Sequence, residues 1–269
     1  SDDARGAQRV NFRRSESERG QDPVGVLAEL RRRRFDAHGA RAEAYRHLRT
    51  NLQYLGLSSH PQAIVITSAL PEEGKSTTAV NLALTIARTG QSVCLVEADL
   101  RRPGISPPLG IENEAGLTSI IVGAAEFDDV VQPWEDTGVD ILPSGHLPPN
   151  PSELLSNEEA EELIKWLQGE YDYVVIDAPP LLAVTDAVIL ARYCGGAIVV
   201  VANLGRNTAT RRQIVQALDN LATGGTKALG FLLTRQPTKG PDALLASKYH
   251  EGYHSSYGEP TDDSFVDLA

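Results

Sequence analysis

The fold of this chain is decided by residues 69–78, which read ALPEEGKSTT. The apolar run from Ala63 to Thr67 comes before this stretch and predicts a buried strand, and a helix is expected to begin near Lys75. A loop of this kind turns its backbone N–H groups inward, and the helix directs the positive end of its dipole toward the same point. The stretch therefore predicts a site for nucleotide phosphates.

The side chains of the loop suit a nucleotide that binds together with Mg²⁺. Lys75 is expected to reach the β and γ phosphates, and the Ser76 hydroxyl group can contact the metal ion. Ala69 stands where the usual pattern has its first glycine, but close approach of the backbone depends mainly on Gly74. The predicted cofactor-binding residues are Ala69, Glu73, Gly74, Lys75, Ser76 and Thr77. The alternative is a chance match in an ordinary strand-turn-helix unit.

The composition indicates a soluble α/β protein. The chain has 269 residues, 41% of them hydrophobic, and a formal net charge of −11, which argues against a general nucleic-acid binder. No apolar run approaches the roughly 20 residues that cross a bilayer. Because methionine is absent, we expect a trimmed boundary, with any membrane attachment supplied from outside the chain. Cys94 and Cys194 lie in or beside apolar runs, which favours buried thiols over a disulfide.

Beyond the loop, short apolar strands alternate with amphipathic helices. We expect strands at 63–67, 93–97, 173–177, 197–202 and 228–233, a less regular region that runs through 139–142, and helices at 41–57, 75–89, 158–169 and about 208–222. This alternation predicts an α/β fold, with a mostly parallel sheet and helices on both faces. Ser156 and Glu159 fit a capping box for the helix at 158–169.

Two of the expected strands end in carboxylates, at the sheet edge where such folds bind ligands. Asp177 ends the strand at 173–177 and can hold a Mg²⁺-bound water near Ser76. Glu97 ends the strand at 93–97 and Asp99 follows two residues later, so period-two spacing predicts that both point to the same side. This pair is either a second acidic group around the metal ion and the incoming nucleophile or a solvated strand end.

The stretch 248–258 contains three of the eight tyrosines, Tyr249, Tyr253 and Tyr257, and no aliphatic residue. These tyrosines have no core to enter. Their spacing of four also fits an aromatic stripe that docks on a partner, although two nearby glycines disfavour an isolated helix. A metal site at the two histidines of the stretch lacks further ligands.

Together these motifs resemble those of the bacterial tyrosine kinases, which autophosphorylate C-terminal tyrosine clusters and help to control capsule or exopolysaccharide assembly. The resemblance covers about residues 41–257. Residues 66–78 are similar to the family's Walker A motif, 97–101 to its Walker A′ motif and 176–179 to its Walker B motif. The resemblance implies a P-loop NTPase fold related to the partition-type ATPases, with ATP and Mg²⁺ as cofactors. Leu70 stands where partition-type ATPases have a second signature lysine, which favours the kinase.

The resemblance also implies roles for individual residues. Catalysis is assigned to Lys75, Glu97, Asp99 and Asp177, metal binding to Ser76, Asp99 and Asp177, and phosphate acceptance to Tyr249, Tyr253 and Tyr257. Glu97 or Asp99 would accept the tyrosine proton, although Glu97 replaces the family's usual Asp. Residues 232–235 stand where relatives often place an Asn that contacts adenine, so no residue is assigned to base recognition. Residues 43–49 are similar to a family helix through which Glu43, Arg46 and Arg49 would help to close a ring, whereas spacing alone predicts intrahelical salt bridges.

We expect a basic, flexible segment at 1–40, a kinase domain at 41–240 and a flexible tyrosine-containing tail at 241–269. The expected partners are other copies of the chain and a transmembrane activator or polysaccharide co-polymerase region, in the same polypeptide or a separate one. That activator would hold the chain in the cytoplasm at the inner face of the membrane. Two functions stay open: a tyrosine autokinase that acts between subunits, and an ATP-dependent assembly switch or scaffold with little kinase activity.

Overall fold

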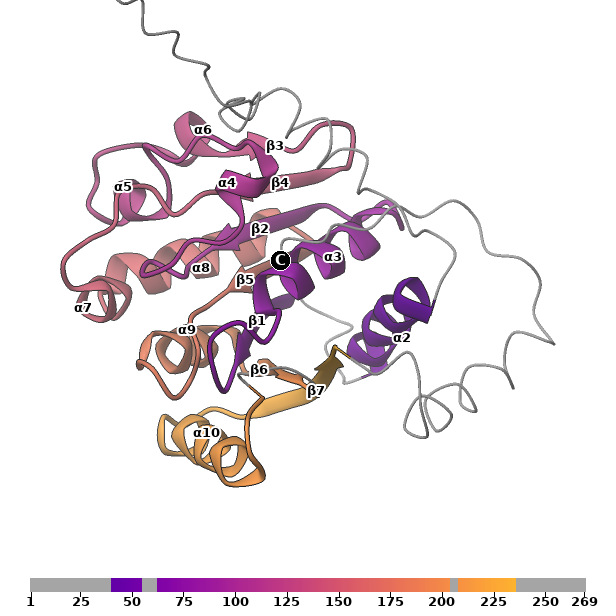
Figure 1. The fold of residues 1–269 in the computed structure, drawn as a ribbon. Coiled ribbons are helices and arrows are strands. Elements are labelled where there is room, and N and C mark those ends of the chain that lie inside the picture. Colours follow the sequence, from indigo (N-terminus) through magenta and orange to yellow (C-terminus); the bar gives the residue numbers. More distant parts are fainter. Residues whose placement is uncertain (1–39, 55–61, 204–207, 236–269) are drawn as a thin grey trace, which may run out of the picture. The chain divides into compact units, whose positions relative to one another are not determined.

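The computed structural model describes residues 40–54, 62–203 and 208–235, which build a seven-stranded sheet with helices on both faces (Figure 1). The strand order is β3-β4-β2-β5-β1-β6-β7. The strands are β1 Gln62–Ser68, β2 Val93–Glu97, β3 Gln132–Pro133, β4 Val139–Leu142, β5 Tyr173–Asp177, β6 Ala197–Ala202 and β7 Ala228–Thr234. Neighbouring strands are parallel except for β3 and β4, which are antiparallel. The predicted α/β class with a mostly parallel sheet is confirmed.

The strand order gathers the predicted site at one edge. β1 lies between β5 and β6, and its Ile66 is in register with Asp177 of β5. Asp177 is in turn in register with Glu97 of β2. The carboxyl ends of β1, β2 and β5 therefore meet beside the loop that follows β1.

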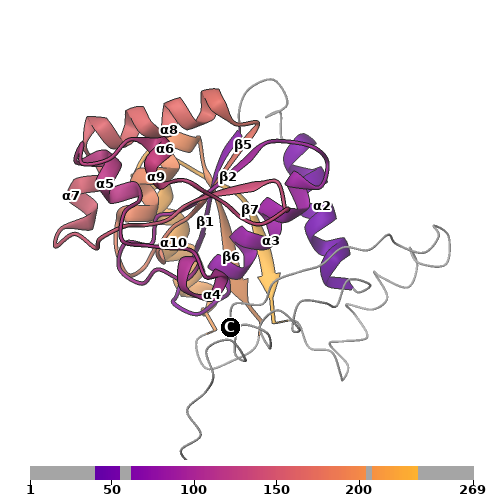
Figure 2. The ribbon, with the colours of Figure 1, turned by 90° about the horizontal axis from the view of Figure 1, so that it is seen from above.

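The sheet separates two hydrophobic clusters, because successive strand residues point to opposite faces. Ile64 and Ile66 of β1 belong to the cluster under α2 (Ala40–Tyr54) and α3 (Lys75–Ala87), whereas Val65 belongs to the other cluster. That second cluster is covered by α8 (Glu158–Glu170), α9 (Asp186–Cys194) and α10 (Arg211–Thr223), which lie on the opposite face (Figure 2). All residues of β2, β5 and β6 are buried, as a parallel sheet covered on both faces requires.

Short helices fill the connections at the β2 and β4 side of the sheet. They are α4 Ser106–Leu109, α5 Leu117–Ile121, α6 Phe127–Val130 and α7 Pro151–Leu155. α4 packs on the same face as α3, through Ile105 and Leu109. α7 contributes the fully buried Leu155 to the cluster under α8 and α9.

The structure differs from the expected elements in three places. The helix expected at 41–57 is α2, which spans Ala40–Tyr54, and residues 55–57 lie outside the described part of the chain. α9 has no counterpart among the expected helices, although its buried Ala187, Leu190 and Ala191 have helical spacing. The expected capping box is wrong, because Asn157 is the N-cap of α8 and the Ser156 hydroxyl donates to the Glu153 carbonyl in α7 instead.

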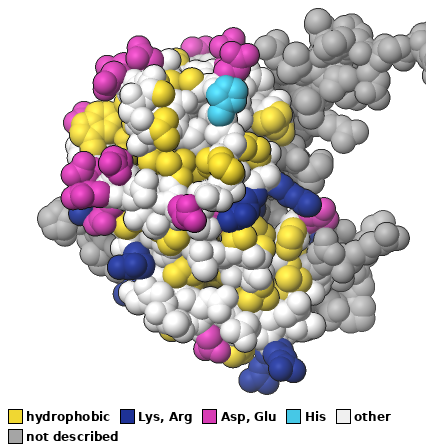
Figure 3. All heavy atoms as spheres, turned by 90° about the vertical axis from the view of Figure 1, so that its left-hand side faces the viewer, with side chains coloured by type: hydrophobic (Ala, Val, Ile, Leu, Met, Phe, Trp, Pro, Cys, Tyr) yellow, Lys and Arg dark blue, Asp and Glu magenta, His cyan; other side chains and the backbone are white. Residues whose placement is uncertain are grey.

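On the face shown in Figure 3, hydrophobic, acidic and basic side chains are intermixed, and acidic side chains gather in its upper part. α8 begins with Glu158, Glu159 and Glu161 in its first turn, where negative charge interacts favourably with the helix dipole. Within the described ranges, every helix is too short or too polar to span a bilayer.

Candidate active site

The loop between β1 and α3 has the backbone of a phosphate site. Glu72 and Gly74 have positive φ values of 64° and 92°, which turn the chain sharply before α3 begins at Lys75. Gly74 is the N-cap residue, and among the residues that the structure describes no side chain caps this helix end. The first N–H groups of α3 are therefore available to an anion, and the helix dipole favours one.

Glu73 holds the loop in place from behind. Its side chain is fully buried, and Oε2 accepts a hydrogen bond from the Leu70 amide at 2.8 Å. Oε1 accepts from the amides of Ala202 at 3.3 Å and Ala209 at 3.4 Å, and the Thr234 hydroxyl donates to the Glu73 carbonyl at 2.7 Å. One residue thus ties the loop to the ends of β6 and β7 and to the approach to α10.

Lys75 lies between two buried carboxylates. Its Nζ is 2.7 Å from Asp99 Oδ2 and 3.3 Å from both carboxylate oxygens of Asp177. Burial by itself lowers the pKa of Lys75, but the charges of Asp177 and Asp99 outweigh burial and raise the pKa above its ordinary value. Lys75 therefore stays charged and is held where β1, β2 and β5 end.

Asp177 is completely buried, and burial raises its pKa to about 6 in spite of the nearby Lys75 charge and the hydrogen bond from Ser76. The Ser76 hydroxyl donates to Asp177 Oδ2 at 2.6 Å. Two carboxylates that share one lysine leave a net negative charge in a buried place, which favours a further cation.

These residues fit Mg²⁺ bound with a nucleotide. A hydroxyl group and carboxylates are the oxygen ligands that Mg²⁺ prefers, and they stand beside uncapped N–H groups that suit phosphate. Gly104 keeps this place open, because a Cβ atom there would lie 2.9 Å from Ser76 Oγ. Ser76 and Asp177 would hold the metal ion, directly or through water, and Lys75 and the loop amides would hold the phosphates.

The structure separates the two carboxylates that the sequence pattern puts on one side. Glu97 is fully buried and accepts from the amides of Ile105 at 2.6 Å and Ser106 at 3.3 Å, and also from the Ser106 hydroxyl. Asp99 lies beyond the end of β2, so strand alternation no longer controls its direction, and it points to Lys75. The expectation that both face the metal ion and the nucleophile is therefore wrong in this structure, where Glu97 holds the start of α4.

Arg101 connects the same region to α7 and α9. Its Nε donates to Asp186 Oδ2 at 3.0 Å, and its Nη2 donates to Ser152 Oγ at 3.0 Å. The Ser152 hydroxyl also donates to Asp186 Oδ1, and the Asp186 side chain is fully buried. The start of α7 therefore fixes the segment that follows β2.

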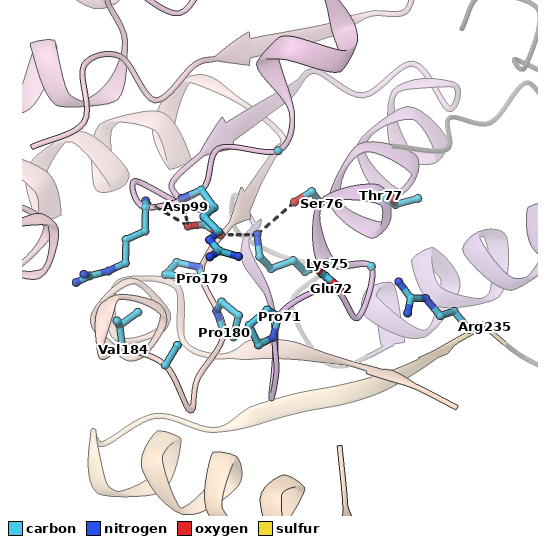
Figure 4. A pocket seen from close by; sticks show the side chains of 15 residues that line it. Pro71, Glu72, Lys75, Ser76, Thr77, Asp99, Pro179, Pro180, Val184 and Arg235 are labelled. Atoms are coloured by element: carbon cyan, nitrogen blue, oxygen red, sulfur yellow. Dashed lines mark hydrogen bonds and ion pairs between the residues drawn. The ribbon is translucent and has the colours of Figure 1, made fainter. Parts of the chain in front are cut away.

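A cavity of about 690 Å³ opens over these groups, within the range of ligand sites (Figure 4). It is lined by Pro71, Glu72, Gly74, Lys75, Ser76, Thr77, Asp99, Arg101, Arg102, Gly104, Pro179, Pro180, Ala183, Val184 and Arg235. Four of the six predicted cofactor-binding residues, Gly74 to Thr77, line it. Ala69 and Glu73 do not, because both are packed in the interior under the loop.

Sequence reasoning missed part of the lining. Gly104 and the Ala183–Val184 pair lie in connections whose path depends on the whole sheet. The sequence gives one weak signal for Gly104, a glycine directly after Pro103. Arg235 ends the stretch 232–235, and its place in the cavity comes from the end of β7.

The remaining predicted residues lie away from the cavity. In α2, Arg46 Nε donates to Glu43 Oε2 at 2.8 Å, and Arg49 Nη1 donates to the Thr85 carbonyl of α3 at 3.3 Å. Glu43 and Arg46 thus form the intrahelical pair that spacing alone predicts, and a role in a ring stays a prediction. Tyr249, Tyr253 and Tyr257 lie outside the described residues.

Comparison with known proteins agrees with this geometry. Residues 62–223 match the model of a family described as AAA domain. The tyrosine-protein kinase YwqD of Bacillus subtilis (strain 168) is 39% identical over 192 residues, which cover 71% of this chain and 80% of that protein. The tyrosine-protein kinase etk of Escherichia coli (strain K12) is 36% identical over 191 residues, which cover 71% of this chain but 26% of that protein. The chain therefore spans about a quarter of the length of the second relative.

Solved structures show the same likeness. The kinase domain of the Escherichia coli tyrosine kinase ETK is 32% identical, with a TM-score of 0.67 over 74% of this chain and 78% of that chain. The septum site-determining protein MinD from Pyrococcus horikoshii, complexed with Mg-ADP, is 25% identical, with a TM-score of 0.53 over 69% of this chain and 76% of that chain. The predicted P-loop fold and kinase class are confirmed, and the chain belongs to the family of bacterial tyrosine-protein kinases.

Proposed function

We propose that this chain is an ATP- and Mg²⁺-dependent protein-tyrosine kinase that phosphorylates Tyr249, Tyr253 and Tyr257 of a neighbouring copy. The supporting observation is that the cavity continues past the phosphate loop along an apolar wall of Pro71, Pro179, Pro180, Ala183 and Val184. Pro179, Pro180 and Val184 of this wall lie on the same side of Lys75 as Asp99 (Figure 4). An apolar wall beside a carboxylate suits the ring and hydroxyl group of tyrosine.

The side chains divide the chemical work. When bound, Mg·ATP supplies the phosphoryl group to be transferred and a divalent cation at its phosphates. Lys75 places a fixed positive charge where negative charge develops during transfer. Asp99 Oδ1 accepts the amides of Arg101 at 3.3 Å and Arg102 at 3.0 Å, which fixes the carboxylate. In this proposal Asp99 would accept the proton of a tyrosine hydroxyl group, whose ordinary pKa is near 10.

The wider proposal follows the family. Residues 41–240 would form the kinase domain, and residues 241–269 the segment that carries the acceptor tyrosines, after a basic segment at 1–40. Added phosphate charge would repel neighbouring copies and so drive cycles of ring assembly and disassembly. A transmembrane activator or co-polymerase region, fused or separate, would hold the chain at the inner face of the membrane and couple the cycle to polysaccharide synthesis or export.

Mass spectrometry of the intact protein and its peptides, before and after Mg·ATP, tests this proposal, with the activator segment supplied in a parallel sample. We expect phosphate on Tyr249, Tyr253 or Tyr257 in the wild type and none in Lys75→Ala. A mixture of Lys75→Ala with the triple Tyr→Phe variant separates the two routes, because phosphate on the Lys75→Ala tail can then come only from another copy. Hydrolysis of ATP with bare tail tyrosines, even with activator, would instead indicate the assembly switch.

A matched pair of variants tests which carboxylate acts. Asp99→Asn should lower the rate of phosphate transfer by about 10² to 10⁴-fold while nucleotide binding persists. Glu97→Gln should lower it far less, because Glu97 contacts the start of α4 and does not line the cavity. The opposite order of effects would return the role of proton acceptor to Glu97.

A further inference from the structure

The cavity has a second end, opposite the apolar wall. Arg235 lines this end and lies on the other side of Lys75 from Asp99 (Figure 4). If Lys75, Ser76 and Asp177 hold the terminal phosphates and the metal ion, the nucleoside part must leave the loop away from Asp99. Of the labelled lining residues, Thr77 and Arg235 lie on this side of Lys75, where we expect the nucleoside to bind.

The backbone supports a functional placement of Arg235. Its φ of 51° lies in the left-handed region, which residues other than glycine rarely adopt. Three non-glycine residues in the described ranges have positive φ, namely Glu72, Glu135 and Arg235. Two of these three line the cavity, and backbone outliers that persist concentrate at ligand sites.

Thr234, the residue before Arg235, binds the phosphate loop through its side chain. The Thr234 hydroxyl donates its proton to the Glu73 carbonyl at 2.7 Å. A Cβ atom at Gly74 would lie 3.6 Å from the Thr234 methyl group, so the side chain is packed against the loop. Thr234 therefore has no proton left to donate to a base edge.

We propose that Arg235 binds the nucleobase by laying its planar guanidinium group over the ring face. This proposal rests on the proposed nucleotide site and assigns its base contact. Guanidinium groups stack well on aromatic faces, and an exposed arginine at the cavity rim can meet a ring without being desolvated first. Stacking uses the face that every base shares, so it secures affinity with little discrimination between adenine and guanine.

Binding measurements on the purified chain test this assignment without any reading of activity. Dissociation constants for Mg·ATP, Mg·GTP and Mg·tripolyphosphate would be compared in wild type, Arg235→Gly and Arg235→Lys. Glycine accepts the positive φ, so Arg235→Gly removes the guanidinium group and keeps the turn. Arg235→Lys keeps the positive charge but replaces the planar guanidinium group, which can stack on a base, with an ammonium group, which cannot. Arg192→Ala removes an exposed charge from the last turn of α9, outside the cavity lining, and is the control for net charge.

We expect Arg235→Gly to raise the dissociation constants of Mg·ATP and Mg·GTP by a similar factor of roughly 5 to 30. The dissociation constant of Mg·tripolyphosphate should change less than about twofold. Arg235→Lys should recover only a small part of that loss. An equal loss for tripolyphosphate would make Arg235 a phosphate contact and overturn the proposal, and so would unchanged ATP affinity. If the wild type binds neither ATP nor tripolyphosphate, both the proposed function and the base contact are wrong. If the wild type and the Arg235 variants bind ATP equally tightly, only the base contact is wrong.

Discussion

At the scale of single residues, the site is governed by charges that water cannot reach. Lys75, Asp99 and Asp177 are 9%, 3% and 0% exposed, and one positive charge faces two negative ones. A buried site of net negative charge gains from a proton or a cation. Burial raises the pKa of Asp177 to about 6, because the loss of hydration of the carboxylate outweighs its attraction to the Lys75 charge, and the nearby Asp99 charge adds to the rise.

Asp177 should exchange a proton for the metal ion. Because its pKa is raised to about 6, about half of the nucleotide-free molecules carry the proton at pH 6 and almost none at pH 8. Since the metal ion needs the ionised carboxylate, binding of Mg·ADP should release protons from Asp177 at pH 6, and affinity should fall as the pH drops below about 6. Calorimetry in buffers of different ionisation enthalpy measures this release.

The control for the proton exchange is Asp177→Asn, which keeps the shape of the side chain and cannot titrate, measured per mole of bound nucleotide at Mg·ADP concentrations that saturate its weaker site. Protons released by the nucleotide itself remain in this variant, so the difference from wild type isolates Asp177. Equal release by both proteins at pH 6 would show that Asp177 is already ionised and would contradict the prediction.

At the scale of elements, the segment after β2 is held by contacts from far along the chain. Arg101 meets Ser152 at the start of α7 and Asp186 at the start of α9. The structure gives α7 a positional role in these contacts. α7 packs against α9, so it carries Ser152 into contact with Arg101 and Asp186.

Ser152→Ala should lower the free energy of unfolding by about 1 to 2 kcal/mol, because it removes a hydroxyl group that accepts from Arg101 and donates to the buried Asp186. Ser156→Ala is the matched control, since its exposed hydroxyl group donates to a carbonyl at the end of the same helix. The control should change stability by less than about 0.5 kcal/mol. Urea unfolding compares them, and equal losses would mean that Ser152 contributes no more than a surface residue.

At the scale of the whole molecule, α2 is the element to which we assign the proposed contact between copies. Within one chain, Leu52 of α2 is buried in the core beside α3, and Tyr45 packs with Leu232 of β7. The Glu43–Arg46 pair is partly exposed on the same helix. An exposed intrahelical pair adds only about 0.2 to 0.5 kcal/mol to stability, so its loss should spare the fold.

If Arg46 helps to close the proposed ring, Arg46→Ala should reduce the mass that the protein reaches with Mg·ATP, at a temperature at which both proteins are folded. Analytical ultracentrifugation measures the mass. Lys165→Ala breaks a comparable exposed pair with Glu161 on α8 and should leave the assembly intact. An unchanged mass for Arg46→Ala would limit the Glu43–Arg46 pair to its contact within α2.

The sequence predicted the larger elements well because their signals are local. Strands at 93–97, 173–177 and 197–202 appear with those bounds, since each is a short apolar run that a covered parallel sheet must bury, whereas β4 lies in a stretch expected to be less regular. The short helices α4 to α7 were not anticipated. Four- and five-residue helices have too few turns to show a period, and tertiary contacts stabilise them.

The sequence by itself determined the phosphate loop, the order of the main strands and helices, and the family, because a loop motif and the period of apolar residues are properties of neighbours in the chain. Only the tertiary structure decided that Asp99 faces Lys75 while Glu97 holds α4, that Ser152 and Asp186 fix Arg101, and that Arg235 reaches the cavity. These outcomes depend on which strand ends are neighbours in the sheet and on where each side chain points after its strand has ended. Neither is encoded in local spacing, because both follow from how distant segments pack together.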